Sequence, residues 1–222
     1  MMAESPEQGL TLDEWRAWVY LLLAQIFRTA PKRSLLQSLA DDRLLSTLMG
    51  GVGDAELSFQ CELVEQDISA NELQQYEEML REDYSKLFVG PGHLKAPPWE
   101  SVYRSQERLL FGEQTLAVRE FYRSYGLEAK QKNAEPDDHI SLELEFMSYL
   151  CRAGSAEEEL SEKYRAGQEV FLREHLLTWA PDFCSDVIQN AECRFFRGVA
   201  EITTRWLAMD AELLASASQK AR

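Results

Sequence analysis

Five consecutive residues, Glu135-Pro136-Asp137-Asp138-His139, form the most compact group of chemistry-bearing side chains in the sequence. Carboxylates beside a histidine can bind a metal ion, orient a general base or grip a basic peptide. The same residues can also serve the fold alone, with an aspartate capping a helix and His139 hydrogen-bonded to its own loop. Spacing leaves both interpretations open, and a metal site would need His93 or a distant carboxylate to converge on the cluster.

A second group lies between Tyr84 and Tyr103, where aromatic, leucine and proline residues gather. Leu87 and Phe88 follow Tyr84 at helical spacing, which is typical of a core-facing helix. The stretch from Val89 to Ser101 has no helical periodicity, yet it is apolar and rich in proline. A loop of this composition has little reason to lie in water unless something packs on it. It is therefore either the wall of a peptide-binding groove or a segment buried against the core.

The strongly diagnostic enzyme motifs are missing from the sequence, including GxxxxGK[ST], GxGxxG, GxSxG and HExxH. The histidines also lack the paired Glu-x-x-His spacing of a di-iron bundle. The four cysteines fit no zinc or redox spacing, and we expect them to be reduced core residues: Cys61, Cys151, Cys184 and Cys193. The sequence thus predicts a protein without catalytic residues and without a metal site.

The balance of charge is strongly acidic, with 38 Asp and Glu against 23 Lys and Arg and a formal net charge of −15. This charge argues against nucleic acid or an anionic membrane as the main partner. Acidic residues gather between residues 54 and 83, where Arg81 is the lone cation. Such a run is either a solvated helix face or a surface that attracts a cationic partner.

The elements that must position these residues are helices. Apolar residues recur at spacings of three and four along most of the chain, and no convincing alternation typical of strands is present. Asp54 is a plausible cap for a further helix. Pro136 is expected to open a helix that becomes apolar on almost every face after Glu145. Three pairs fit the capping-box pattern: Thr11 with Glu14, Ser69 with Glu72, and Ser155 with Glu158.

The fold class predicted is therefore all-α, a globular bundle of about nine to eleven helices. The last helices are expected over residues 155–176, about 181–191 and about 195–215. A polar connector before Pro136 is the best candidate for a hinge, which divides the chain into residues 1–126, 127–137 and 138–222. The two larger parts can also pack as one domain. No basic n-region begins the chain, so we expect a cytoplasmic protein.

Three sequence blocks, in order, resemble a known family: YSKLFVGPGHLKAPPWESVY, LLFGEQTLAVREFY and EPDDHISLELEFM. Together they are similar to the TorD/DmsD branch of the redox-enzyme maturation chaperones, which also includes NarJ-like proteins. The resemblance is dense over residues 76–150 and diffuse elsewhere. Gly92 and Tyr103 depart from the pattern, because DmsD-type relatives carry tryptophans there.

The resemblance implies a cytoplasmic all-helical chaperone that binds the twin-arginine leader of a molybdenum-cofactor oxidoreductase precursor and holds it until maturation is complete. It places leader binding in three motifs of the family, the Tyr-x-x-Leu-Phe helix end, the Pro-Pro-Trp loop and the Asp-His of the hinge. The matching residues in this chain are Tyr84, Leu87, Phe88, Pro98, Trp99, Tyr103, Gly112, Asp138 and His139.

These residues lead to a mechanistic hypothesis. Leu87, Phe88, Pro98 and Trp99 would bury the apolar part of the leader, while Asp138 and neighbouring carboxylates would pair with its two arginines. The resemblance implies no cofactor, although it admits weak GTP binding, transient contact with the Tat translocase, and a monomer or a domain-swapped dimer. An alternative function is a nucleotide- or metal-binding switch that uses Asp138 and His139, and a third is a structural subunit of a mature enzyme.

Overall fold

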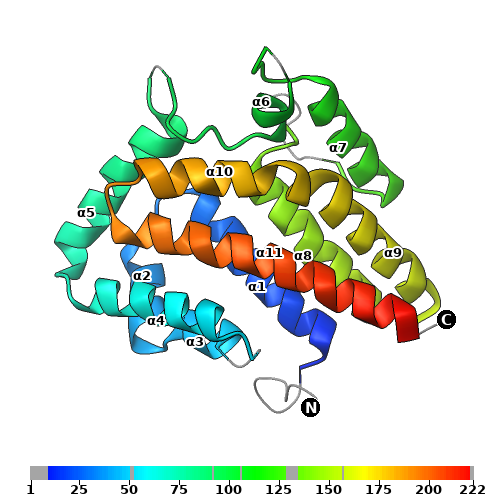
Figure 1. The fold of residues 1–222 in the computed structure, drawn as a ribbon, viewed down its shortest axis with the longest axis horizontal. Coiled ribbons are helices and arrows are strands. Elements are labelled where there is room, and N and C mark those ends of the chain that lie inside the picture. Colours follow the sequence, from blue (N-terminus) through cyan, green and yellow to red (C-terminus); the bar gives the residue numbers. More distant parts are fainter. Residues whose placement is uncertain are drawn as a thin grey trace.

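The structure is a computed structural model, and it is built from helices (Figure 1). The residues it describes contain no strand, and Trp99 and His139 form an isolated antiparallel β-bridge. The all-α prediction is therefore confirmed. The described residues are 10–50, 53–91, 93–105, 107–128, 135–156 and 158–220.

The helices follow one another through short connections. The α-helices are α1 (Leu12–Arg28), α2 (Arg33–Asp41), α3 (Leu44–Met49), α4 (Ala55–Ser69), α5 (Leu73–Tyr84), α6 (Glu100–Arg104), α7 (Glu113–Ser124), α8 (Ile140–Ala156), α9 (Ser161–Phe171), α10 (Leu177–Asn190) and α11 (Arg194–Lys220). The π-helices η1 (Ser85–Val89) and η3 (Leu172–Leu176) and the 3-10 turn η2 (Glu158–Leu160) join some of them. None of the described helices has both the length and the apolar character needed to cross a membrane.

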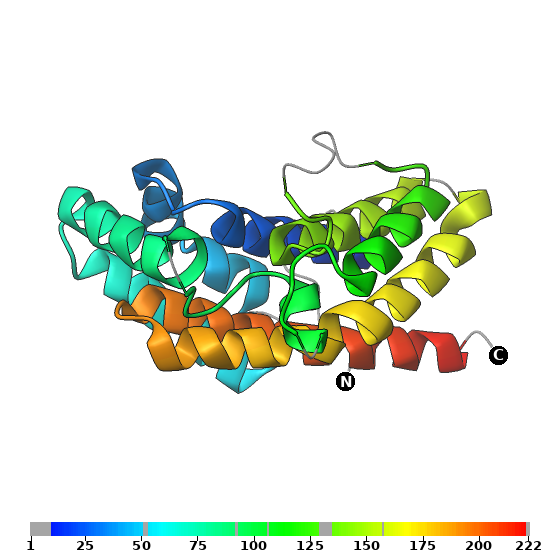
Figure 2. The same cartoon turned by 90° about the horizontal axis from the view of Figure 1, so that it is seen from above.

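Two layers of long helices enclose the core. Helix α1 packs along α8, and α11 packs against both α10 and α4. Figure 2 shows α1 and α8 on one side of the molecule and α10 and α11 on the other. Between the layers, the Trp206 ring meets Trp15 and Tyr20 edge-on, with ring centroids 5.2 and 5.5 Å apart. These buried aromatic contacts join the first and last helices of the chain.

Side-chain caps explain where two of the helices begin. Thr11 and Glu14 form the expected capping box of α1, in which each side chain accepts the other residue's backbone N–H. Asp54 caps α4 by accepting the backbone N–H of Leu57 at 3.0 Å. Both caps satisfy amides that a helix leaves without internal partners, and both predictions are confirmed.

The other two capping-box predictions are wrong. Helix α4 continues through Ser69, and Glu72 itself caps α5 by accepting the Gln75 N–H at 2.9 Å. Ser155 lies inside α8, which runs to Ala156. In both pairs the serine belongs to the end of the preceding helix and the glutamate lies beyond that end, so the serine cannot cap the next helix.

The prediction that Pro136 opens a helix is also wrong. Helix α8 begins at Ile140, and Pro136 belongs to an irregular turn that leads to the β-bridge of His139. Of the predicted hinge at 127–137, residues 129–134 lie outside the described residues. Gly126, just before the predicted hinge, has a φ of +75°, a conformation that glycine adopts without strain.

The break expected before residue 181 is absent, since α9, η3 and α10 follow one another directly from 161 to 190. Pro181 lies inside α10, where its ring removes one backbone donor. The preceding π-turn inserts an extra residue per turn and reorients the helix. Figure 1 shows α9 and α10 meeting at an angle, so one segment contributes to both ends of the molecule.

The cysteines lie where the sequence predicts them. All four are free and buried: Cys61, Cys151, Cys184 and Cys193. Loss of hydration is the largest cause that raises the pKa of each thiol to about 12. Thiols with so high a pKa remain protonated and unreactive at neutral pH.

Candidate functional site

The fold brings together two motifs that are far apart in the sequence. The backbone N–H of Glu100 donates to the Asp138 carbonyl at 3.0 Å, and the N–H of Ile140 donates to the Pro98 carbonyl at 2.9 Å. These bonds fix the Pro-Pro-Trp loop against the turn that precedes α8. Pro98, Trp99, Asp138 and His139 therefore form one structural unit.

A cavity of about 630 Å³ lies beside this unit, between α1, α7, α8 and the segment that leads to His139. Its volume falls within the range typical of ligand sites. Apolar and aromatic side chains supply much of the wall: Tyr122, Leu127, Leu142, Phe146 and Tyr149. Polar and charged side chains supply the rest: Arg28, Glu128, Glu135, His139, Ser141 and Glu145.

Trp99 supports this wall through two contacts. Its indole Nε1 donates to Glu135 Oε1 at 2.7 Å. Its ring lies edge-on to His139, with the centroids 5.8 Å apart. Because both partners line the cavity and the tryptophan is half-buried, Trp99 fixes the position of two lining residues.

His139 is an uncharged member of the wall. Burial, assisted by the positive charge of Arg28, lowers the pKa of His139 to about 3. Its Nδ1 accepts the backbone N–H of Ser141 at 3.1 Å, which places the proton of the neutral ring on Nε2. The imidazole therefore presents a donor and brings no positive charge that would repel a cationic ligand.

Tyr84 reaches the same region from the end of α5, and its hydroxyl donates to the Phe27 carbonyl at 3.0 Å. Burial raises the pKa of Tyr84 to about 12, the Glu135 charge adds to this shift and Arg28 opposes it. The tyrosine thus lies within electrostatic reach of two residues that line the cavity.

Leu87 and Phe88 do not line the cavity, because both are buried in the core. The Phe88 ring packs against Phe27 and Phe196, at centroid distances of 6.1 and 5.7 Å. Ala96 and the two prolines before Trp99 are buried as well. In this structure these side chains support the loop and none of them lines the cavity, and their expected contact with a leader stays a prediction.

Asp138 is likewise buried and internally bonded. Its Oδ2 accepts the backbone N–H of Ser101 and its Oδ1 accepts the Thr115 hydroxyl, each at 2.7 Å. This carboxylate therefore ties the start of α6 and the start of α7 to the turn before α8. Its expected pairing with a leader arginine stays a prediction, and such an arginine would compete with these two internal hydrogen bonds.

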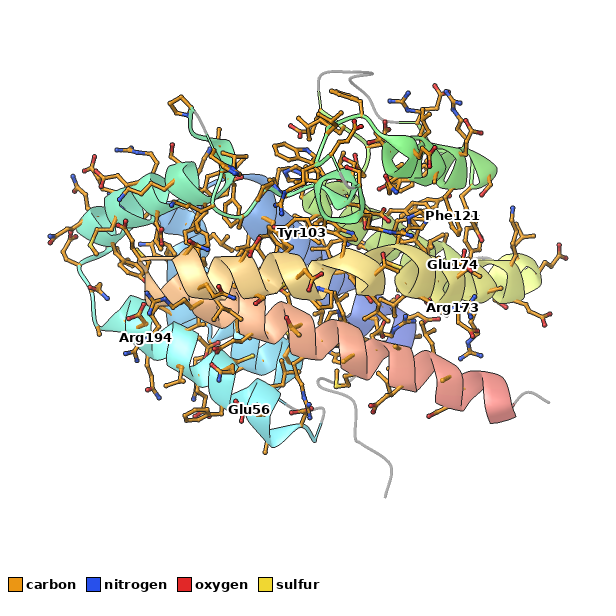
Figure 3. All side chains as sticks on the ribbon, turned by 45° about the horizontal axis from the view of Figure 1, so that its top comes forward. Glu56, Tyr103, Phe121, Arg173, Glu174 and Arg194 are labelled. Atoms are coloured by element: carbon orange, nitrogen blue, oxygen red, sulfur yellow. The ribbon has the colours of Figure 1, made fainter. Side chains whose placement is uncertain are left out.

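Tyr103 and Gly112 lie away from the cavity lining. The Tyr103 hydroxyl donates to Asp186 Oδ2 at 3.0 Å, and its ring lies 5.7 Å from that of Trp179. Figure 3 shows Tyr103 beside α10 and Phe121 farther along the molecule. Gly112 is the N-cap residue of α7. Gly92, whose type departs from the family pattern, lies outside the described residues.

Five lining residues of α8 were not singled out from the sequence. Leu142, Phe146 and Tyr149 are spaced by four and three residues, and Ser141 and Glu145 are also four apart, so they lie on neighbouring strips of one helix surface. This spacing is visible in the sequence, but the surrounding apolar residues predict a helix that is buried on all sides and therefore has no face lining a cavity. Arg28, at the end of α1, carries no sequence pattern that marks it.

The site contains no evident metal centre. Within the described ranges, no group of three or more His, Cys, Asp or Glu side chains is placed to hold a metal ion. The Asp138 and His139 side chains form bonds within the fold instead. The geometry of these residues therefore gives no support to the metal-switch alternative.

The overall architecture has a counterpart among solved structures. The fold matches a crystal structure of a redox enzyme maturation protein from Archaeoglobus fulgidus, with a TM-score of 0.51 and 20% sequence identity over 90% of this chain and 99% of the other. A family model described as nitrate reductase delta subunit matches residues 54–185. The chain belongs to this family, and the resemblance to its TorD/DmsD branch is confirmed.

Two relatives show how far the similarity extends. The Tat proofreading chaperone DmsD of Salmonella typhi is 33% identical over 132 residues, which cover 60% of each chain. The match thus spans about three-fifths of the length of that relative. The chaperone protein TorD of Shewanella pealeana is 24% identical over 212 residues, or 92% of each chain. Both are named as chaperones.

Proposed function

We propose that this protein is a cytoplasmic maturation chaperone that binds the twin-arginine leader of a molybdenum-cofactor oxidoreductase precursor and holds it before Tat export. The names of the relatives support the chaperone role. The observation that carries leader binding is the cavity beside Trp99 and His139, where aromatic walls and glutamates lie together. Binding and release are sufficient for this role, which needs no catalytic residue.

The chemistry of a twin-arginine leader fits this cavity. Such a leader has a basic segment followed by an apolar one, so its receptor needs carboxylates next to apolar walls. A charge-assisted hydrogen bond from an arginine to a carboxylate contributes roughly 1.5 to 3 kcal/mol when it is shielded from water. Micromolar affinity corresponds to about 8 kcal/mol, which a few such bonds and one or two buried apolar anchors can supply.

The cavity residues divide the task by their chemistry. Glu145, which pairs with Arg28, and Glu135, which accepts the Trp99 indole N–H, are both exposed and offer carboxylates to the leader arginines. Leu142 and Phe146 form an apolar floor on α8 for the segment that follows the arginines. The Nε2–H of His139 can donate to a leader carbonyl. Asp138, Leu87 and Phe88 are buried in the core and support the segments that carry these residues.

The proposal is tested by calorimetry with a synthetic leader peptide. Glu145→Gln removes a carboxylate and keeps the side-chain shape, so we expect affinity to fall by about fivefold to tenfold. Glu78→Gln is the matched control, because Glu78 is also exposed and paired with an arginine but lies on α5 away from the cavity. Equal affinities of the two variants for the leader would refute the proposed site.

A further inference from the structure

Arg28 is the cation of the described cavity lining, which otherwise holds glutamates and neutral residues. It is the last residue of α1, and its guanidinium pairs with Glu145 of α8 across 117 residues of sequence. Both side chains are about half exposed, at 45% and 49%. The pair therefore lies where the cavity meets solvent.

The charge of Arg28 acts inside the cavity as well as at its edge. It contributes, after burial, to the lowered pKa of His139, and it opposes the raised pKa of Tyr84. Both shifts place the guanidinium within electrostatic range of these two rings. An arginine of the chain itself thus occupies the region that the proposed function assigns to an arginine of the leader.

We propose that Arg28 is an internal placeholder, whose guanidinium occupies the Glu145 carboxylate until an arginine of the leader displaces it. The inference rests on the proposed function and adds a determinant of affinity and specificity. Both the displaced group and the group that displaces it are guanidinium groups. The binding free energy that a leader arginine gains at Glu145 is therefore only the difference between its own pair with Glu145 and the pair of Arg28 with Glu145. A ligand that lacks a cationic group cannot displace Arg28 and therefore gains no interaction with Glu145.

The ion pair between Arg28 and Glu145 is weak enough to be displaced by a ligand. Half-exposed ion pairs contribute little to stability, because water and salt screen them and the long side chains lose freedom. Arg28 can therefore swing into solvent at small cost when a ligand arrives. Removal of Arg28 should accordingly tighten leader binding by about twofold to fivefold, the range that a pair of this kind can supply.

The test is a double-mutant cycle measured by calorimetry, at one salt concentration, with a synthetic leader that carries two consecutive arginines. The proteins are the full chain and its Arg28→Gln, Glu145→Gln and doubly substituted variants. We expect Arg28→Gln to bind more tightly than the unsubstituted chain. Glu145→Gln should weaken binding more in the Arg28→Gln background, because Glu145 is already free there for the leader.

Two controls separate displacement from a general effect of charge. Arg81→Gln removes the same charge from an exposed arginine paired with Glu78 on α5. A leader with both arginines replaced by glutamine lacks the competing group. The gain from Arg28→Gln should exceed that from Arg81→Gln, and it should vanish with the substituted leader.

The outcomes distinguish the placeholder from the proposed function. Leader binding that is unchanged or weaker in Arg28→Gln, with the unsubstituted chain binding well, overturns the placeholder alone. Binding by Arg28→Gln but not by the unsubstituted chain supports it. If none of the four proteins binds the leader, the proposed function fails and the placeholder fails with it.

Discussion

His139 lines the cavity as a neutral imidazole, and its neutrality follows from its surroundings. Burial removes the hydration that a charged ring needs, and Arg28 adds repulsion. A protonated histidine at this position would oppose a cationic ligand. The same burial links the charge state of His139 to the stability of the fold.

The first prediction concerns the pH dependence of stability. Because the pKa of His139 is lowered to about 3, the unfolded chain takes up the proton first as the pH falls below about 6.5. The free energy of unfolding should fall with acidification by up to about 1.4 kcal/mol per pH unit from this group. His139→Gln should flatten that slope in urea unfolding between pH 7.5 and 5. Parallel pH profiles for the two proteins would contradict this account.

Glu143 is a second buried titratable residue, close to the site but outside it. Its Oε2 accepts the Trp179 Nε1–H at 3.1 Å, and a hydrogen bond shared with the Glu100 carboxyl favours the protonated form of Glu143. Burial is the largest cause that raises the pKa of Glu143 well above its usual value, and the charges of Glu100 and Asp138 raise it further.

The second prediction follows from this raised pKa. The folded state holds the Glu143 proton more tightly than the unfolded chain. The contribution of Glu143 to the free energy of unfolding is therefore fully present below pH 4.5, and it is lost as the pH rises through the pKa of Glu143 in the folded state. Glu143→Gln cannot lose a proton, and it should be more stable than the unsubstituted chain by about 1 to 2 kcal/mol at pH 8. Thermal unfolding should show the difference shrinking toward pH 4.5. Glu162→Gln, on the exposed face of α9, is the control.

At the scale of elements, Asp138 connects three segments through one carboxylate. It accepts the backbone N–H of Ser101 in α6 and the hydroxyl of Thr115 in α7, from the turn before α8. Tyr122 of α7 adds a bond from its hydroxyl to the Asp137 carbonyl at 3.1 Å. Short helices such as α6 depend on tertiary bonds of this kind, because isolated short helices are marginal in water.

The third prediction tests this connection. Asp138→Ala leaves a buried amide and a buried hydroxyl without their acceptor, which should lower the free energy of unfolding by about 2 to 4 kcal/mol. Hydrogen exchange should increase over residues 100–104 and 113–124, with α4 less affected. Asp182→Ala, at an exposed position of α10, should change stability by less than about 0.5 kcal/mol. Protection that remains unchanged in α6 and α7 would show that Asp138 is not the connection.

The sequence predicts the elements better than the surfaces they present. Helical periodicity and the Thr11 and Asp54 caps identify helices because these patterns are local. The orientation of the Asp138 side chain depends on residues distant in sequence, since its partners Ser101 and Thr115 come from other segments. The pairing of Arg28 with Glu145 depends on how α1 crosses α8, which no spacing within either helix encodes. The motifs thus pointed to this region of the fold, and packing decided which of their side chains line the cavity.

At the scale of the whole molecule, much of the negative charge lies apart from the cavity. Residues 54–83 carry a large share of the net charge of −15. In Figure 3, Glu56 of α4 lies toward the bottom of the molecule, whereas Phe121 lies at the upper right on α7, the helix that contributes Tyr122 to the cavity. Charges at such a separation act through the long-range field and make no direct contact with a ligand in the cavity.

The fourth prediction follows from this separation. Neutralising four exposed acids of α4 and α5 (Glu56, Glu62, Glu78 and Glu82, each to glutamine) should slow association of a basic leader by about threefold to tenfold at low salt. Dissociation should stay unchanged, because these residues lie outside the cavity lining. Stopped-flow measurements at two salt concentrations separate the two rates. A faster dissociation would instead place the leader on α4 and α5.

The central claim is that a twin-arginine leader binds in the cavity beside Trp99 and His139. The most direct measurement is photo-crosslinking with a leader peptide that carries a photoreactive residue next to its arginine pair, followed by mass spectrometry of the crosslinked chain. We predict crosslinks to residues 135–149 and to Arg28, and their loss when unlabelled leader competes. Competed crosslinks that map to α4 and α5, or to the exposed residues Leu109, Leu110 and Phe111, would contradict the account.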